Sequence, residues 1–354
     1  MGLKHEAGST VKVGTRDSAL AMVQTNFIVG KLKELNPGVS FDLVSMQTIG
    51  DEVLDKPLPK IGESSLFTKE LEIALEDGRW ADLLVHSLKD LPTNLPPGMA
   101  IGAIYKRQDP HDALILHLKH KGLKLQDLPA GSVIGTCSLR RIAQLTRKFP
   151  HLKFENVRGN LNTRLRKLDE NGLYDALILA KAGLDRLGWK DRIDQVITPD
   201  ECLYAVGQGA LAVELNIKDS KTVAMIAELY DFETAVVCAA ERAFLRQLEG
   251  GCSVPVGVES VFKDNKLTLT GAVLSLDGKK CVQETMTTDI PPVNEDKKGN
   301  QPTLGVSSIL MPSHMYDAMH QGEELGQNLA KDLIARGADV ILAQAKLEIS
   351  TDPK

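Results

Sequence analysis

Apolar residues in the first half of the chain fall into short runs that alternate with segments of helical spacing. A run at 11–15 precedes apolar positions at helical spacing up to Leu35, where Asn36-Pro37-Gly38 ends the predicted helix. The same spacing predicts a helix at 68–77, and further runs predict strands at 41–46, 81–86, 100–105, 112–117 and 174–180. This alternation of strands and helices is typical of an α/β fold.

The opening pattern occurs a second time near the middle of the chain. Residues 13–20 read Val-Gly-Thr-Arg-Asp-Ser-Ala-Leu, and residues 134–141 read Ile-Gly-Thr-Cys-Ser-Leu-Arg-Arg. Each copy has the end of a strand, a Gly-Thr turn and a Ser in the position of a helix N-cap. We therefore expect two similar α/β lobes with a ligand-binding cleft between them. We interpret 181–188 as a loop of the second lobe and 206–210 as a close-packed crossing back into the first.

From residue 231 the pattern becomes that of a small α+β domain. A helix at 233–248 ends at Gly250-Gly251, strands follow at 254–260, 266–275 and 281–287, and a helix runs from about 321 to 336. The polar segment 291–302 is interpreted as a mobile insertion. We expect a first lobe at 10–107 and 207–230, a second lobe at 108–206 and a C-terminal domain at 231–354.

Residues 48–65 show no periodicity and contain two Gly and two Pro among charged residues. A loop of this length in a compact domain is commonly a lid. We therefore expect it to cover the cleft.

Composition narrows the class of protein. Five cysteines are scattered without a Cys-x-x-Cys pair, and the eight histidines form no metal-ligand pattern, which favours a reducing compartment and a metal-free protein. The N-terminal segment has no apolar leader, and no stretch approaches a membrane span. We expect a cytoplasmic protein.

Positive charge is concentrated in one segment. Residues 138–167 contain nine Lys or Arg and one Glu, in a chain whose net charge is −5. For Arg140, Arg141, Arg158 and Arg164, which lie near turns at predicted strand ends, we favour contact with an anionic ligand. For Arg147, Lys148, Arg166 and Lys167 a solvated helix face is the better interpretation. Binding to nucleic acid is the weakest alternative, because no aromatic residues are interleaved for base stacking.

A carboxylate and a lysine follow the predicted strand at 81–86. Pro92 prevents continuation of that strand, so Lys89 and Asp90 project from its carboxyl end, where α/β proteins place their sites. The alternative is an ordinary turn Asp beside a solvated Lys.

Cys252 directly follows a predicted helix C-terminus, whose dipole opposes thiolate formation. Its position suits permanent attachment of a group better than repeated nucleophilic attack, although a small buried turn residue is the simpler interpretation.

Six separated motifs resemble those of the hydroxymethylbilane synthase family, also called porphobilinogen deaminases. They are Val13-Gly14-Thr15-Arg16, Phe67-Thr68-Lys69-Glu70, Val85-His86-Ser87-Leu88-Lys89-Asp90-Leu91-Pro92, Ser138-Leu139-Arg140-Arg141, Arg158-Gly159-Asn160-Leu161-Asn162-Thr163-Arg164 and Leu248-Glu249-Gly250-Gly251-Cys252-Ser253. The resemblance implies two lobes similar to a periplasmic binding protein pair, plus the C-terminal domain. It also implies a transferase of haem and tetrapyrrole biosynthesis that deaminates four porphobilinogens and joins them head to tail into hydroxymethylbilane.

The resemblance further implies a dipyrromethane cofactor joined to Cys252 by a thioether, with Asp90 as the catalytic carboxylate. The implied cofactor and substrate contacts are Arg16, Gln24, Ser87, Lys89, Thr136, Ser138, Arg140, Arg141, Arg158, Arg164 and Arg186, and the implied lid residues are Lys60 and Phe67. It implies a monomer with a small-molecule substrate and no nucleic-acid or membrane partner, and 291–302 resembles the animal cytosolic type. Every pyrrole brings two carboxylates, and loss of ammonia leaves a cation, so an arginine-lined cleft with one fixed anion suits this chemistry.

Three positions depart from the family pattern: Asp17, Ser64 and Cys137. An anionic Asp17 beside Arg16 is expected to reduce activity. The competing class is a non-catalytic protein that binds polycarboxylates in the same cleft.

Overall fold

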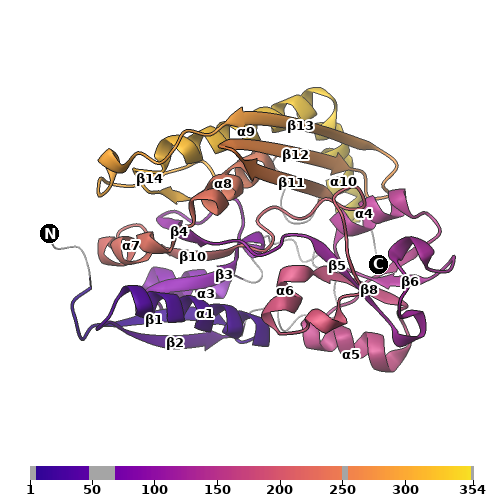
Figure 1. The fold of residues 1–354 in the computed structure, drawn as a ribbon, viewed down its shortest axis with the longest axis horizontal. Coiled ribbons are helices and arrows are strands. Elements are labelled where there is room, and N and C mark those ends of the chain that lie inside the picture. Colours follow the sequence, from indigo (N-terminus) through magenta and orange to yellow (C-terminus); the bar gives the residue numbers. More distant parts are fainter. Residues whose placement is uncertain (1–4, 48–67, 249–253, 352–354) are drawn as a thin grey trace.

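The structure is a computed structural model that describes residues 5–47, 68–248 and 254–351. Two α/β lobes lie side by side, and a third domain of helices and an antiparallel sheet lies against both (Figure 1). This architecture confirms the predicted fold class.

The first lobe is built on a five-stranded sheet in the order β2-β1-β3-β10-β4. β1 runs parallel to β2 and β3, whereas β10 runs antiparallel to β3 and β4. The strands are β1 Thr10–Arg16, β2 Ser40–Met46, β3 Leu83–Ser87, β4 Met99–Tyr105 and β10 Leu211–Asn216. Neighbouring strand residues point to opposite faces, and Leu83 packs with residues of α1 (Ala19–Leu35) while Leu84 packs with residues of α3 (Lys69–Asp77). The two helices therefore cover opposite faces of the sheet, and α7 (Ser220–Ile226) follows β10.

The second lobe repeats this arrangement with the order β7-β6-β8-β5-β9. Again the first three strands are parallel and the fourth runs antiparallel to both of its neighbours. Its elements are β5 Asp112–Leu116, β6 Val133–Gly135, α4 Leu139–Lys148, β7 Lys153–Glu155, α5 Leu161–Asn171, β8 Ala176–Ala180, α6 Lys181–Arg186 and β9 Gln195–Val196. The matching strand orders confirm the internal repeat predicted from the two Gly-Thr motifs.

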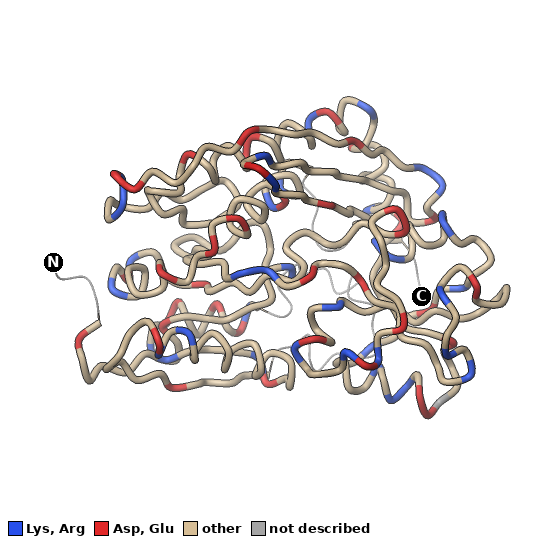
Figure 2. The backbone as a smooth tube through the Cα atoms, in the orientation of Figure 1, with Lys and Arg blue, Asp and Glu red and all other residues tan. Residues whose placement is uncertain are grey.

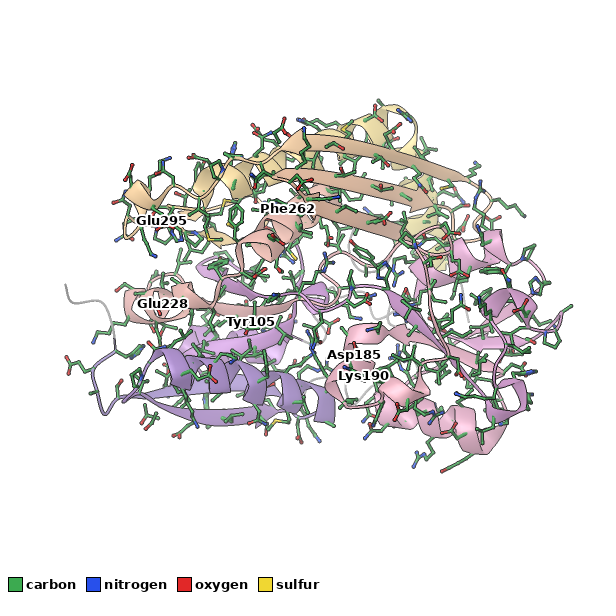
Figure 3. The ribbon with its side chains drawn as sticks, in the orientation of Figure 1. Tyr105, Asp185, Lys190, Glu228, Phe262 and Glu295 are labelled. Atoms are coloured by element: carbon green, nitrogen blue, oxygen red, sulfur yellow. The ribbon has the colours of Figure 1, made fainter. Side chains whose placement is uncertain are left out.

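In the third domain, two long helices pack on an antiparallel sheet. The elements are α8 Phe232–Gln247, β11 Val256–Lys263, β12 Lys266–Leu274, β13 Cys281–Asp289, β14 Thr303–Leu304, β15 Leu310–Met311, α9 Tyr316–Ala335 and α10 Ala338–Thr351. A Cβ at Gly326 of α9 would lie 2.1 Å from the Ala240 carbonyl oxygen of α8, so glycine permits the close approach of these helices. Phe262 of β11 meets Phe232 edge-on, with 6.2 Å between ring centroids (Figure 3).

The two segments that cross between the lobes are fixed to the third domain at one buried carboxylate. Glu241 of α8 forms an ion pair with Arg107 (Oε1 to Nη1, 2.7 Å) and accepts hydrogen bonds from the Gly207 N–H and the Ser260 hydroxyl, both 2.8 Å. A Cβ at Gly209 (φ +90°) would lie 2.4 Å from the Gln108 carbonyl oxygen. This contact confirms the close-packed crossing at 206–210.

One prediction about a loop is wrong. Residues 181–186 form helix α6, in which Lys181 pairs with Asp185 at 2.8 Å and the absence of a Cβ at Gly183 leaves room for Leu161 of α5. The segment 291–302 is packed on the third domain, because Lys297 pairs with Asp317 (2.8 Å) and Ser313 donates to the Lys297 carbonyl (2.6 Å). The mobility of this segment stays a prediction.

Candidate active site

A cleft of about 470 Å³ lies between the two lobes. It is formed where strands end and helices begin in both lobes, at the carboxyl edges of the two sheets, as expected for α/β folds. Its walls include residues that follow β1, β2, β3 and β8, the first turns of α1 and α5, helix α6, and Gln208-Gly209 of the crossing segment. Helices α6 and α1 contact each other beside it (Figure 1).

The charged lining of this cleft is mostly basic. Among the described residues, six cations and two carboxylates border it: Arg16, Lys89, Arg141, Arg158, Arg164, Arg186, Asp17 and Asp90. Figure 2 shows several Lys and Arg residues around α5 and α6, on the side of the second lobe that faces the first lobe. The structure thus brings together nine of the predicted site residues, namely these six cations, Asp90, Gln24 and Ser87.

Asp90 is held by rigid surroundings. It ends a 3₁₀ turn, Leu88–Asp90, that directly follows β3, and its side chain is half-buried at the cleft wall. Leu88 is fully buried, and its N–H donates to the Ala210 carbonyl at 3.0 Å. On the other side, Arg242 of α8 donates to the carbonyls of Leu91 (3.2 Å) and Pro92 (2.7 Å). Both flanks of Asp90 are therefore fixed by other parts of the fold.

The cations of the second lobe are oriented by backbone carbonyls. Arg164 Nε donates to the Gly159 carbonyl at 2.8 Å, next to Asn160, whose side chain caps α5 by accepting from Thr163 N–H at 2.9 Å. Arg186 donates to the Gly209 carbonyl at 2.6 Å, and burial lowers the pKa of Arg186 to about 10. Its neighbour Asp185, labelled in Figure 3, pairs with Lys181. Backbone carbonyls thus position the guanidinium groups of Arg164 and Arg186 at the cleft.

In the first lobe, polar side chains are linked in the same way. Gln24 of α1 is buried and donates to the Ser87 hydroxyl at 2.9 Å. Lys89 donates to Gln208 Oε1 at 3.4 Å, and burial together with Arg141 and Arg140 lowers its pKa, against the opposing effect of Asp90 and Asp112. The carboxylate of a ligand would oppose this shift and favour the charged form of Lys89.

Arg140 and Arg141 have a different environment from the one we expected. Arg140 is buried, pairs with Asp112 at 2.8 Å, donates to the Leu203 carbonyl at 2.6 Å, and is not among the residues that line the cleft. Arg141 pairs with the other Asp112 oxygen at 2.7 Å and does reach the cleft. Burial alone would raise the pKa of Asp112, but the two guanidinium groups hold it well below its ordinary value. Within the described ranges, Arg140 is therefore an ion-pair partner of Asp112 outside the cleft lining, and its contact with a ligand stays a prediction.

Thr136 and Ser138 also lie outside the cleft lining. Thr136 is fully buried, and its hydroxyl accepts from the Ser138 N–H at 3.3 Å. The Ser138 hydroxyl caps α4 by accepting from the Arg141 N–H at 3.4 Å, as the sequence predicted. In this structure both side chains support the turn before α4, and neither borders the cleft.

Several predicted positions lie outside the described residues. These are Cys252, Lys60, Phe67, Ser64 and the expected lid at 48–65. Across the described ranges, no group of three or more His, Cys, Asp or Glu side chains is placed to hold a metal ion. None of the helices in those ranges combines the length and apolar character needed to cross a membrane.

The structure adds site residues that the sequence reasoning missed. Gln208 borders the cleft and donates to Asp112 Oδ1 at 2.9 Å, and His86 lies beneath the cleft wall in contact with Glu214 at 3.0 Å. Asp112 and Glu214 are both buried acids inside apolar strands, and that pattern is the signal that could have revealed them.

Comparison with known proteins identifies the family. Residues 11–224 match the family model of the porphobilinogen deaminase dipyromethane cofactor binding domain, and residues 235–301 match that of the porphobilinogen deaminase C-terminal domain. The chain is 50% identical over 312 residues to the porphobilinogen deaminase of Synechococcus sp. strain CC9902, covering 87% of this chain and 97% of that one. It is 53% identical over 274 residues to that of Synechococcus elongatus, covering 77% and 85%.

Among solved structures, the BenM effector binding domain with its effector benzoate matches 64% of this chain and 95% of its own, with 14% identity and a TM-score of 0.39. The family models and the curated relatives together cover most of the sequence, including both lobes and much of the third domain. The chain belongs to the porphobilinogen deaminase family.

Proposed function

We propose that this cleft deaminates four porphobilinogen molecules and joins them head to tail, releasing hydroxymethylbilane and ammonia. The observation that carries the proposal is one fixed carboxylate, Asp90, in a cleft bordered by six cations. Incubation of the purified protein with porphobilinogen should release ammonia and hydroxymethylbilane. A protein that only binds polycarboxylates would retain the substrate unchanged.

The cleft suits the dipyrromethane cofactor that names the matched family domain. Arg141 Nε is buried at the cleft and has no hydrogen-bond partner within the described ranges, so it has unused capacity for an acidic ligand. Arg141, Arg158 and Arg164 would hold the carboxylates of the cofactor, and Cys252 would anchor it. When bound, the cofactor supplies the pyrrole to which the first substrate is joined.

The other residues of the site bind the substrate or stabilise the charge that forms during the reaction. Arg16, Lys89 and Arg186 neutralise the acetate and propionate groups of the incoming substrate, and Gln24 with Ser87 orients its polar atoms. Asp90 faces the carbon from which ammonia leaves and stabilises the cation that forms there, because a preorganised charge is most effective where charge develops.

The proposal also includes the domain boundaries, the cellular location, the absence of other partners and the lid residues. We place the first lobe at 10–107 and 207–230, the second at 108–206 and the third domain at 231–354, in a cytoplasmic monomer without nucleic-acid or membrane partners. Lys60 and Phe67 are proposed for a lid over the cleft. The assignment to the animal type rests on 291–302 alone, whereas the relatives described above are cyanobacterial.

Cys252→Ser is expected to yield a protein without the covalent cofactor, because the hydroxyl replaces the sulfur that forms the thioether. Intact-mass measurement should show the bare polypeptide for this variant and one added dipyrromethane for the unaltered protein. Cys202→Ser is the control, since Cys202 is buried beside Arg140 and should not affect the added mass. An added mass that survives in Cys252→Ser would contradict the assignment.

Arg164→Gln is expected to weaken binding of acidic pyrroles with little effect on the fold. A hydrogen bond to a charged group contributes about 1.5–3 kcal/mol, which corresponds to a KM raised about ten- to 150-fold. Arg166→Gln is the matched control, because Arg166 lies on the same helix, is exposed and does not border the cleft. Equal KM values for the two variants would remove Arg164 from the binding set.

A further inference from the structure

A small side pocket opens beside Asp90, and the roles proposed above do not use it. Its volume is about 40 Å³, and the residues that border both it and the cleft are Arg16, Ser18, Leu20, Gln24, Ser87 and Asp90. A water-sized molecule needs about 10–15 Å³ of such volume. The side pocket therefore has room for a few molecules the size of water or ammonia, and it is too small for a pyrrole ring.

A buried acidic cluster lies behind this side pocket. His86 borders the pocket, and its Nε2 lies 3.0 Å from Glu214 Oε2. Glu214 of β10 is fully buried, and Glu72 of the facing helix α3 is 7% exposed. His86 Nε2, both Glu214 carboxylate oxygens and Glu72 Oε1 have no hydrogen-bond partner within the described ranges, so His86 and Glu214 are in ion-pair contact without an aligned hydrogen bond. We call His86, Glu214 and Glu72 the proton cluster.

Glu72 of the proton cluster favours its protonated form. An ionised carboxylate in the protein interior is strongly unfavourable unless it is paired and hydrogen-bonded. Burial raises the pKa of Glu72, and Glu214 adds to this, whereas Thr68 and His86 oppose it. The other charged groups around the cluster are Glu70 of α3 and, at the side pocket, Arg16 and Asp90. His86 contacts Glu214 and borders the side pocket, so it connects the proton cluster to the pocket.

The reaction produces a base that needs such a proton. When the C–N bond of the protonated aminomethyl group breaks, both bonding electrons remain on nitrogen, and neutral ammonia leaves a cation on the carbon. Neutral ammonia is a nucleophile that adds back to this cation, whereas ammonium cannot. Amines are far stronger bases than imidazole, so ammonia accepts a proton from an imidazolium readily. The new C–C bond releases one proton from the ring carbon that it joins, and this proton restores the cluster.

We propose that the side pocket receives the departing ammonia and that His86, backed by Glu214 and Glu72, converts it there to ammonium. Each ring added then transfers one proton from carbon to nitrogen and releases one ammonium ion, so atoms and charge balance. This inference rests on the proposed function, because ammonia is a product of that reaction only. It makes His86 responsible for preventing reversal of the deamination step.

The test is isotope exchange in the cofactor-loaded enzyme. Porphobilinogen is turned over in the presence of ammonium labelled with heavy nitrogen, and the label in the remaining substrate is measured per turnover. His86→Gln keeps a polar side chain but cannot carry a proton. Incorporation of labelled nitrogen into porphobilinogen per turnover should therefore rise at least about tenfold, and kcat should fall by about tenfold or more, in line with loss of a general acid. His120→Gln is the control, because His120 also contacts a carboxylate, Asp175 at 2.9 Å, away from the cleft.

A second variant covers the case in which His86→Gln does not fold. Glu72→Gln leaves the contact between His86 and Glu214 but removes the carboxyl group of raised pKa that supplies the proton, so exchange per turnover should rise in this variant as well. Exchange per turnover equal to that of the unaltered enzyme would overturn the role of the proton cluster. If the unaltered enzyme releases no ammonia from porphobilinogen, the proposed function itself fails, which is a separate result.

Discussion

Asp90→Asn is expected to abolish nearly all formation of hydroxymethylbilane while leaving the fold intact. The amide keeps the shape of the side chain but removes the negative charge that is proposed to stabilise the substrate cation. Loss of one preorganised electrostatic partner costs about 10²–10³ in rate, and a group used in each of several additions should cost at least that much. Asp90→Glu keeps the charge but displaces it, so its activity should be intermediate.

The structure explains why Asp90 should be this sensitive. Its backbone is fixed on one side by the hydrogen bond from Leu88 N–H to Ala210 and on the other by Arg242, which is 1% exposed. A carboxylate on such a support has little freedom to adjust, and precise placement accounts for much of its effect on the transition state. Removal of the charge therefore cannot be compensated by a local shift.

The cleft provides a matched control for this prediction. Asp17 is the other carboxylate that borders the cleft, and Asp17→Asn makes the same chemical change a short distance away. We expect this variant to keep or increase activity, because it removes an anion from beside Arg16. The measurement is product formation by cofactor-loaded protein. A loss below about tenfold in Asp90→Asn, small against the expected electrostatic effect, would assign stabilisation of the cation to another group.

Local sequence patterns predicted the elements that build the cleft. Ser18 and Ser138 each cap the helix that follows, as their positions indicated. The apolar runs located β1 to β5 and β8 but missed β7, β9 and β10, and the end of β3 placed Lys89 and Asp90 at the cleft. These features depend on residues close together in the chain, so they can be predicted from periodicity and capping preferences.

The partners of the arginines could not be predicted in the same way. Arg140 and Arg141 follow a strand end, which indicates an anion-binding position, but strand order decides what they meet. β5 lies next to β8 and carries Asp112, which is 28 and 29 positions away from these arginines in the chain. Helix α6 was missed for a related reason. Gly183 weakens the local helix preference, whereas its close packing against Leu161 of α5 favours the helix in the folded protein.

Asp112→Asn is expected to reduce the free energy of unfolding of the second lobe by about 3–5 kcal/mol, the usual cost of breaking a buried ion pair by removing one partner. Both Arg140 and Arg141 are at least 94% buried, so the substitution leaves two cations inside the protein without their shared carboxylate. Gln208 also loses its charged acceptor, which loosens the crossing segment at the cleft. Activity should therefore fall together with stability.

The pH dependence gives an independent check of the Asp112 assignment. Because the two guanidinium groups hold the pKa of Asp112 well below its ordinary value, its contribution to stability is fully present above about pH 4. It is lost as the pH falls further toward the folded-state pKa. The stability difference between the unaltered protein and Asp112→Asn should thus be constant near neutral pH and shrink in acid.

Asp109→Asn, at a half-exposed carboxylate that pairs with His111 and Lys181, should cost less than about 1 kcal/mol. Denaturant unfolding and hydrogen exchange of β5 and β8 measure both variants, and equal losses for Asp112→Asn and Asp109→Asn would show that the buried pair does not hold the second lobe together.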